Sequence, residues 1–235
     1  DFEIIIVCVR HYQLPEILSL LNKTEKAHVL FFCNNWSECA PFYLALSHER
    51  VFFGMPRAGG NITESNELIG GLFEEVILGQ SQATFYPKLL ELFDSSCLKP
   101  TPIEDMQSWY WTHMATTVAW ITGSAKAGGF VKFSRSWFAL KQAVLVGREA
   151  VSVAAGRGAE TAACKDAAVF KLPSAIAATL LWVMMRAPII QAISKGHATP
   201  DDLKAICQDV LSMAKTVKLN VPLLQQAVPF VSILK

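Results

Sequence analysis

The sequence lacks three features that would point to whole classes of function. Its longest apolar run, residues 172–185, is shorter than the roughly 20 residues that a membrane-spanning helix needs, and Arg186 and Pro188 interrupt it. The 21 Lys and Arg residues are balanced by 20 Asp and Glu residues and form no cluster among aromatics, which argues against a nucleic-acid partner. The six cysteines form no CxxC pair, and no histidine lies near them at the spacing of a zinc site. We therefore expect a cytoplasmic protein with reduced core thiols, no membrane segment and no metal site.

The first hundred residues have the pattern of a parallel sheet. Three short apolar runs, at 2–9, 28–33 and 51–53, are separated by segments with the apolar spacing of helices, one of which begins at Pro15. This β-α-β-α-β order is typical of the second half of a doubly wound nucleotide-binding sheet. The first half, with its phosphate-binding glycine loop, is absent from the sequence. We therefore expect a partial Rossmann-type sheet, and we interpret the chain as a fragment of a dinucleotide enzyme.

The third apolar run leads into the segment Phe53-Gly-Met-Pro-Arg-Ala-Gly-Gly60. We expect a loop here, because adjacent glycines let the backbone at Gly59 and Gly60 approach a ligand closely. Two further strands, at 72–78 and 98–102, are expected to pair in antiparallel orientation.

From Ile103 onward the apolar spacing becomes helical, and no strand pattern follows. Helices are expected at 106–126, 134–155, 173–194 and 200–217, with a last one near Pro222. The segment Gly156-Arg-Gly158 imitates part of a dinucleotide fingerprint, but it follows a helix, so we interpret it as a helix C-cap. The predicted architecture is α/β followed by all-α, with domains at 1–102 and 103–235.

A few single residues suggest functional roles. The pair Asn34-Asn35 follows the second strand, and open α/β sheets bind ligands at strand C-terminal ends, so Asn35 is a candidate for orienting a substrate or a nicotinamide. His113 lies in an apolar helical segment, where a histidine is more often structural than catalytic. The aromatic residues beside it, Trp109 to Trp111, are expected to pack in the core and at a domain interface.

Taken together, these motifs resemble the ketopantoate reductase (2-dehydropantoate 2-reductase) family. The order is strand–Arg10–helix, strand–Asn34-Asn35, and then residues 53–60, which are similar to the family's Phe-Gly-x-Pro-Gly-Ala-Gly-Gly stretch. The helical half, including His197-Ala-Thr-Pro-Asp-Asp-Leu203, resembles the family's C-terminal domain of the 6-phosphogluconate-dehydrogenase-like type. The resemblance implies NAD(P)H-dependent reduction of an α-keto acid by hydride transfer, as in pantothenate biosynthesis, with NADP favoured over NAD.

The resemblance also implies roles for particular residues. His113 stands where the family has the lysine of its Trp-x-Lys motif, and an imidazole, with an ordinary pKa of about 6.5, is suited to donating the proton. Asp202 matches the family's acidic residue and is the second catalytic candidate. Asn35 and Thr117 match its substrate-binding asparagines. We expect these residues to line a cleft between the domains, with cofactor contacts from Arg10, Asn35, Gly59 and Gly60.

Three interpretations remain open. The first is an oxidoreductase that acts on a keto acid or a related carbonyl compound. The second is a non-catalytic relative that binds a nucleotide or metabolite, and the third is an interaction module whose helical domain forms a homodimer. Loss of the family's lysine favours the last two, whereas the presence of Asn35, Asp202 and the glycine pair favours the first, which we prefer.

Overall fold

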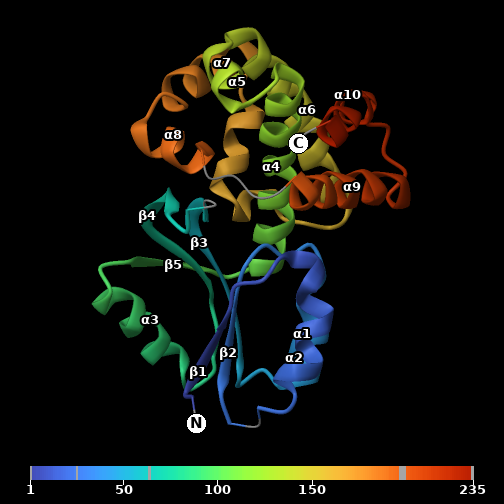
Figure 1. Ribbon diagram of the computed structural model, residues 1–235. Coiled ribbons are helices and arrows are strands. Elements are labelled where there is room, and N and C mark those ends of the chain that lie inside the picture. Colours follow the sequence, from blue (N-terminus) through green and yellow to red (C-terminus); the bar gives the residue numbers. More distant parts are fainter. Residues whose placement is uncertain (1, 25, 63–64, 196–199, 234–235) are drawn as a thin grey trace. The chain divides into compact units, whose positions relative to one another are not determined.

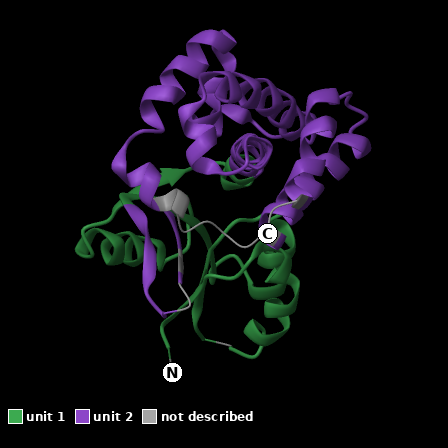
Figure 2. Ribbon diagram, turned by 45° about the horizontal axis from the view of Figure 1, so that its top comes forward, with its two compact units in different colours: residues 1–57, 73–110 green, residues 58–72, 111–235 purple. Residues whose placement is uncertain are grey.

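Residues 2–24, 26–62, 65–195 and 200–233 are described by the computed structural model. The chain divides into two compact units (Figure 2). Residues 1–57 and 73–110 form one, called the sheet unit below, and residues 58–72 and 111–235 form the other, called the helical unit. From the sequence we expected the domain boundary between residues 102 and 103, with residues 58–72 in the sheet domain. In the structure the boundary lies between residues 110 and 111, and residues 58–72 belong to the helical unit.

The sheet unit is built on five strands in the order β1-β2-β3-β4-β5. Its elements are β1 (Ile4–Val7), α1 (Leu14–Leu21), β2 (His28–Phe32), α2 (Ala40–Leu46), β3 (Val51–Ile62), β4 (Leu68–Gly79), α3 (Tyr86–Ser95), β5 (Lys99–Ile103) and the start of α4 (Met106–Ala127) (Figure 1). Strands β1, β2 and β3 are parallel. Gly54 lies against Ile77 and Gly60 against Ile69, so β4 runs antiparallel to β3, and β5 pairs parallel with β4. Antiparallel pairing is therefore confirmed for β4, whereas it is wrong for β5, which pairs with β4 in parallel orientation.

Helices cover both faces of the sheet at β2 and at the start of β3, which explains why residues 29–32 and 51–53 are apolar. Leu30 pairs in register with Phe52, and both pack in a cluster with side chains of α3. Phe31 pairs with Phe53, and their rings meet Phe42 of α2, at a centroid distance of 4.8 Å from Phe31. Successive strand residues point to opposite faces, so β2 and β3 each supply both layers of the core. Figure 1 shows α3 on one side of the sheet and α1 and α2 on the other.

The prediction of a glycine loop at residues 53–60 is wrong, because β3 continues through these residues to Ile62. Here β3 pairs with β4, and the two backbones approach very closely. A Cβ atom on Gly60 would lie 2.7 Å from the Ile69 carbonyl oxygen, and one on Gly70 would lie 2.4 Å from that of Gly59. The glycines are therefore explained by the approach of two strands, with no need for a ligand.

The helical unit contains no strand after β5 within the part of the chain that is described, as expected. Its helices are α4 from residue 111, α5 (Phe130–Arg135), α6 (Trp137–Gly156), α7 (Ser174–Met184), α8 (Pro188–Lys195), α9 (Pro200–Thr216) and α10 (Pro222–Ala227), with 3₁₀ helices η2 (Thr161–Ala163), η3 (Lys165–Lys171) and η4 (Val228–Ile233). The segment expected as one helix at 173–194 is broken before Pro188, whose ring and missing N–H prevent α7 from continuing. Among the described residues, no helix is long and apolar enough to cross a membrane.

The end of α6 confirms the C-cap interpretation of the Gly156-Arg-Gly158 motif. Gly158 has a φ of +105°, and the N–H groups of Gly158 and Ala159 donate to the carbonyls of Ala155 and Ala154. A glycine adopts this backbone without the steric cost that a Cβ atom imposes. The motif ends a helix, so it does not support a second nucleotide site.

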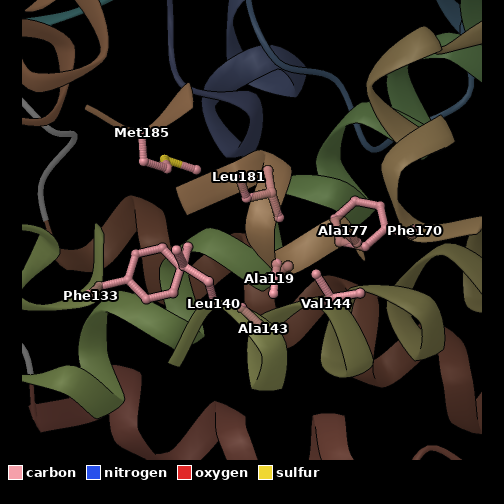
Figure 3. Packing of buried hydrophobic residues seen from close by; sticks show 10 residues of the cluster. Ala119, Phe133, Leu140, Ala143, Val144, Phe170, Ala177, Leu181 and Met185 are labelled. Carbon is pink, nitrogen blue, oxygen red and sulfur yellow. The ribbon is translucent and has the colours of Figure 1, made fainter. Parts of the chain in front are cut away.

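The core of the helical unit forms around α6, which packs against α4, α5, α7 and η3 (Figure 3). Two glycines make close packing possible. A Cβ atom on Gly123 of α4 would lie 2.5 Å from the Phe133 ring, and one on Gly147 of α6 would lie 2.1 Å from the Phe170 ring. The buried residues of this cluster are Ala119, Phe133, Leu140, Ala143, Val144, Phe170, Ala177, Ala178, Leu181 and Met185.

The cysteines are free thiols, but they are not all core residues. Cys33, Cys39, Cys164 and Cys207 are buried, whereas Cys8 and Cys97 are exposed. The expectation of core thiols is therefore wrong for those two.

Candidate active site

The predicted site residues fall into both units. Arg10 and Asn35 belong to the sheet unit, while His113, Thr117, Asp202, Gly59 and Gly60 belong to the helical unit. A cleft shared by all seven thus stays a prediction, and each group is described by itself.

Arg10 and Asn35 lie just beyond the carboxyl ends of neighbouring parallel strands. Val7 of β1 pairs with Phe31 of β2, and Arg10 and Asn35 follow these residues by a few positions. Arg10 is exposed, and its Nη1 donates to the Tyr12 hydroxyl at 3.0 Å. The carboxyl edge of a parallel sheet is where open α/β folds bind ligands, and a guanidinium there suits a phosphate or carboxylate.

Asn35, in contrast, is almost completely covered, with an exposed fraction of 1%. Its Oδ1 accepts the Ser37 N–H at 2.9 Å, and its Nδ2 lies 3.7 Å from Cys39 Sγ. An asparagine that bonds the backbone two residues ahead stabilises a turn. The carboxamide therefore shapes its own loop, and its contact with a ligand stays a prediction.

Gln107 and Tyr110, in the first turns of α4, hold this edge of the sheet. Sequence reasoning did not single them out as polar anchors. Gln107 accepts the Cys39 N–H at 2.5 Å and donates to the Ser37 carbonyl at 3.1 Å. The fully buried Tyr110 hydroxyl lies 2.7 Å from the Gly54 carbonyl oxygen, to which it donates. Burial raises the pKa of Tyr110 well above its ordinary value, so the hydroxyl stays a donor. Their three-residue spacing on a helix was the available signal.

The aromatic residues at the start of α4 are core residues, as expected. Trp109 has an exposed fraction of 2% and Trp111 one of 8%. Within the helical unit, the Arg157 guanidinium lies 3.8 Å from the centre of the Trp111 ring, a cation–π contact between the end of α6 and α4. This contact helps to hold the turn of α4 that carries His113.

His113 is half-buried on α4, and its Nδ1 faces a carboxylate. Nδ1 lies 4.0 Å from Asp166 Oδ2 and is itself buried, although 23% of the His113 side chain is exposed. Thr117, one turn later, donates from Oγ1 to the His113 carbonyl at 2.9 Å. A carboxylate beside one ring nitrogen orients the ring, which leaves the other nitrogen for proton transfer.

Asp166 and Cys164 are the site residues that sequence reasoning missed. Both lie at the start of η3, far from His113 in the sequence, and one potential ligand atom from each of the three side chains lies within 4.8 Å of the others. The sequence carries no local signal for this cluster, because the spacing between α4 and η3 is set by the packing of the whole helical unit.

Asp202 lies in the first turn of α9 and is buried, with an exposed fraction of 8%. A carboxylate at this position is stabilised by the positive end of the helix dipole, which accounts for it structurally. Its catalytic role stays a prediction. The nearby His197 and its two following residues lie outside the described residues.

Comparison with protein-family models and with curated protein sequences gave no match. Several solved structures match over 99% of the chain. D-mandelate dehydrogenase with NADH is 13% identical, with a TM-score of 0.67 over 78% of its chain. Dimeric ketopantoate reductase from Staphylococcus aureus is 12% identical, with a TM-score of 0.66 over 77% of its chain. The 2-dehydropantoate 2-reductase from Geobacter metallireducens GS-15 is 13% identical, with a TM-score of 0.70 over 77% of its chain. The chain therefore has the fold of the ketopantoate reductases, as the sequence resemblance implied.

Proposed function

We propose that this protein is a nicotinamide-dependent oxidoreductase that reduces an α-keto acid or a related carbonyl compound. The His113–Asp166 pair is the observation that carries the proposal, because it provides a positioned acid on a fold shared with ketopantoate reductases and D-mandelate dehydrogenase. The carboxylate of Asp166 beside the ring is a reason for His113 as proton donor that is independent of the family resemblance.

The reaction needs one proton at the substrate oxygen. When bound, a reduced nicotinamide supplies the hydride that goes to the carbonyl carbon. Negative charge then develops on the oxygen, and a donor beside it lowers the barrier. His113 donates from the nitrogen that faces away from Asp166. Asp166 lies beside the other ring nitrogen and holds the orientation of the ring during the transfer. Asp166 is thus a positioning residue, and His113 is the catalytic acid.

The sheet unit offers one residue that fits a dinucleotide. Arg10 is exposed at the carboxyl edge of the parallel strands, and its guanidinium matches the geometry of a phosphate. This favours NADP over NAD, since an arginine near a strand end accommodates the additional phosphate of NADP. The connections from β1 to α1 and from β2 to α2 contain no glycine, so we assign no pyrophosphate contact to them.

The remaining predicted residues take supporting roles. Asp202 would hold a substrate hydroxyl. The Thr117 hydroxyl donates its hydrogen to the His113 carbonyl, so its oxygen would accept a hydrogen bond from the substrate. Asn35 would act through the loop that it shapes at the end of β2. We further propose a cytoplasmic homodimer formed through the helical unit, in line with the dimeric S. aureus ketopantoate reductase.

The test is kinetic and uses the full natural chain. Oxidation of NADPH or NADH is followed with ketopantoate and a panel of other α-keto acids. His113→Ala should lower kcat by about a hundredfold or more, the usual scale for removing a general acid. His113→Lys should retain turnover, because an ammonium group can donate the same proton.

A control variant makes the result decisive. Ser152→Ala removes an exposed hydroxyl of α6 that donates to the Glu149 carbonyl of its own helix at 2.7 Å, so it should leave kcat within a few-fold of the parent. An unchanged kcat in His113→Ala would remove His113 from the mechanism. An absence of both cofactor binding and turnover in the parent would favour the interaction module instead.

A further inference from the structure

The cluster of His113, Cys164 and Asp166 has the chemistry of a metal site. It combines an imidazole nitrogen, a thiol sulfur and a carboxylate oxygen, with one ligand atom from each lying within 4.8 Å of the others. Imidazole, thiolate and carboxylate are the ligands that Zn²⁺ takes in proteins, and three protein ligands with an open fourth position are a common arrangement.

The distances are compatible with a single ion after a small contraction. Around a tetrahedral Zn²⁺ the ligand atoms lie roughly 3.3 to 3.6 Å apart, given its bond lengths to nitrogen, oxygen and sulfur. The His113–Asp166 pair is already at 4.0 Å. Side-chain shifts of about 1 Å or less would bring the three atoms to this spacing.

The backbone that carries two of the ligands is held firmly. Cys164 has an extended backbone at the start of η3, and its carbonyl accepts the Ala167 N–H at 3.1 Å. At the other end of η3, Arg148 of α6 donates from Nε to the Phe170 carbonyl at 2.8 Å. Such support keeps ligands close to their bound geometry and lowers the ordering cost of binding.

Burial differs among the ligands in a way that permits access. Cys164 is 1% exposed, whereas the side chains of His113 and Asp166 are 23% and 38% exposed. The sulfur would therefore be the inner ligand, and the ion would enter from the side of the other two. The fourth position would be taken by water.

We propose that His113, Cys164 and Asp166 bind one divalent transition-metal ion, with Zn²⁺ as the preferred ion, and that the bound ion switches off proton donation by His113. Binding releases the thiol proton and occupies an imidazole nitrogen that carries no proton, so the ring is not the cationic acid while the metal is bound. The inhibitory part rests on the proposed function, and the binding part does not.

Cobalt(II) tests the binding part without cofactor or substrate. The full natural chain is freed of metal with a chelator and titrated with Co²⁺ alone, which has a thiolate-to-cobalt absorption band when a cysteine is a ligand. We expect saturation at one equivalent and loss of the band when Zn²⁺ is added. Cys164→Ser should abolish the band. Asp166→Asn, at a partly exposed position, should weaken binding by about tenfold or more.

The matched control is Cys207→Ser, which changes another buried thiol of the helical unit. Cys207 is not part of the cluster of potential ligands found among the described residues, so this variant should keep the band. No thiolate band in the parent, a band that survives in Cys164→Ser, or a band lost in Cys207→Ser would each overturn the site.

Turnover then tests the inhibitory part. Zn²⁺ should abolish keto-acid reduction by the parent and by Cys207→Ser, and should inhibit Cys164→Ser much less. Cobalt binding with unimpaired turnover in zinc would refute the switch while leaving the site. Cobalt binding in a protein with no turnover would count against the proposed function alone, and would leave Zn²⁺ binding as the property of this cluster.

Discussion

Gly147 of α6 offers a sharp test of how the helical unit is packed. An alanine at this position would place its Cβ atom 2.1 Å from Cε1 of Phe170, 2.6 Å from Cδ1 and 2.8 Å from Cζ. Ordinary contact begins at 3.4 Å, so the ring has to recede by about 1.3 Å. Phe170 is buried, and its ring also packs against Trp120 at a centroid distance of 5.6 Å. The ring therefore has little room to move.

Two opposing terms set the size of the effect. Replacing a helical glycine by alanine stabilises a helix by about 1 kcal/mol. Overpacking a core costs about 1 to 3 kcal/mol, and an overlap this large, against an anchored ring, belongs at the upper end. We therefore expect Gly147→Ala to lower the free energy of unfolding by about 2 kcal/mol. The same shift would displace η3, which carries Asp166 and Cys164, so kcat and cobalt affinity should fall too.

The assay is urea denaturation followed by far-ultraviolet circular dichroism. Gly156→Ala is the matched control, since it changes the last residue of the same helix, where the nearest atom is the flexible Leu219 Cδ1 at 2.9 Å. It should remain within about 1 kcal/mol of the parent. If Gly147→Ala were as stable as the parent or more stable, the packing of Phe170 against α6 would be refuted.

Two further predictions concern buried polar groups. Tyr110→Phe should lower the free energy of unfolding by about 1 to 2 kcal/mol in the same urea assay, because it removes a buried hydroxyl bonded to the Gly54 carbonyl; a change below a few tenths would contradict that bond's contribution. Burial raises the pKa of Cys33, Cys39 and Cys207 from 9.0 to about 12, so the folded state holds their protons more tightly than the unfolded state. Stability should be unaffected by these thiols below pH 9 and should fall as the pH rises from there toward 12, by roughly 1 kcal/mol per pH unit for each. Urea titrations across this range should show a shallower decline for Cys207→Ser, and an identical decline would refute its share.

Local patterns were enough to predict most elements. Apolar runs identified β2 and the start of β3, and helical spacing identified α1, α4, α6 and α9, because periodicity reports directly on which side chains are buried. Periodicity did not predict two helix boundaries. Pro188 interrupts a segment that periodicity alone left as one continuous helix, and α6 begins after Ser136, a few residues from its predicted start. The resemblance to ketopantoate reductases also led to the correct fold, through the order of motifs along the chain.

The segment at residues 53–60 shows where local reasoning failed. Glycine and proline there suggested a loop, but β3 continues because β4 returns alongside it and satisfies its backbone hydrogen-bonding groups. Gly60 and Gly70 need to be glycines for the two strands to approach each other, and the sequence alone cannot place these residues side by side.

For the candidate site, the sequence by itself determined the residue types and the helix of His113, since a motif on one helix is a local property. Only the tertiary structure decided that Asp166 and Cys164 stand beside that ring and that the Asn35 carboxamide is buried in its own turn. Contacts between residues far apart in the chain depend on how helices pack, and packing is set by the complementary shapes of many side chains at once. Periodicity and spacing report on one segment at a time, so they could not reveal the carboxylate and thiol that define the chemistry of His113.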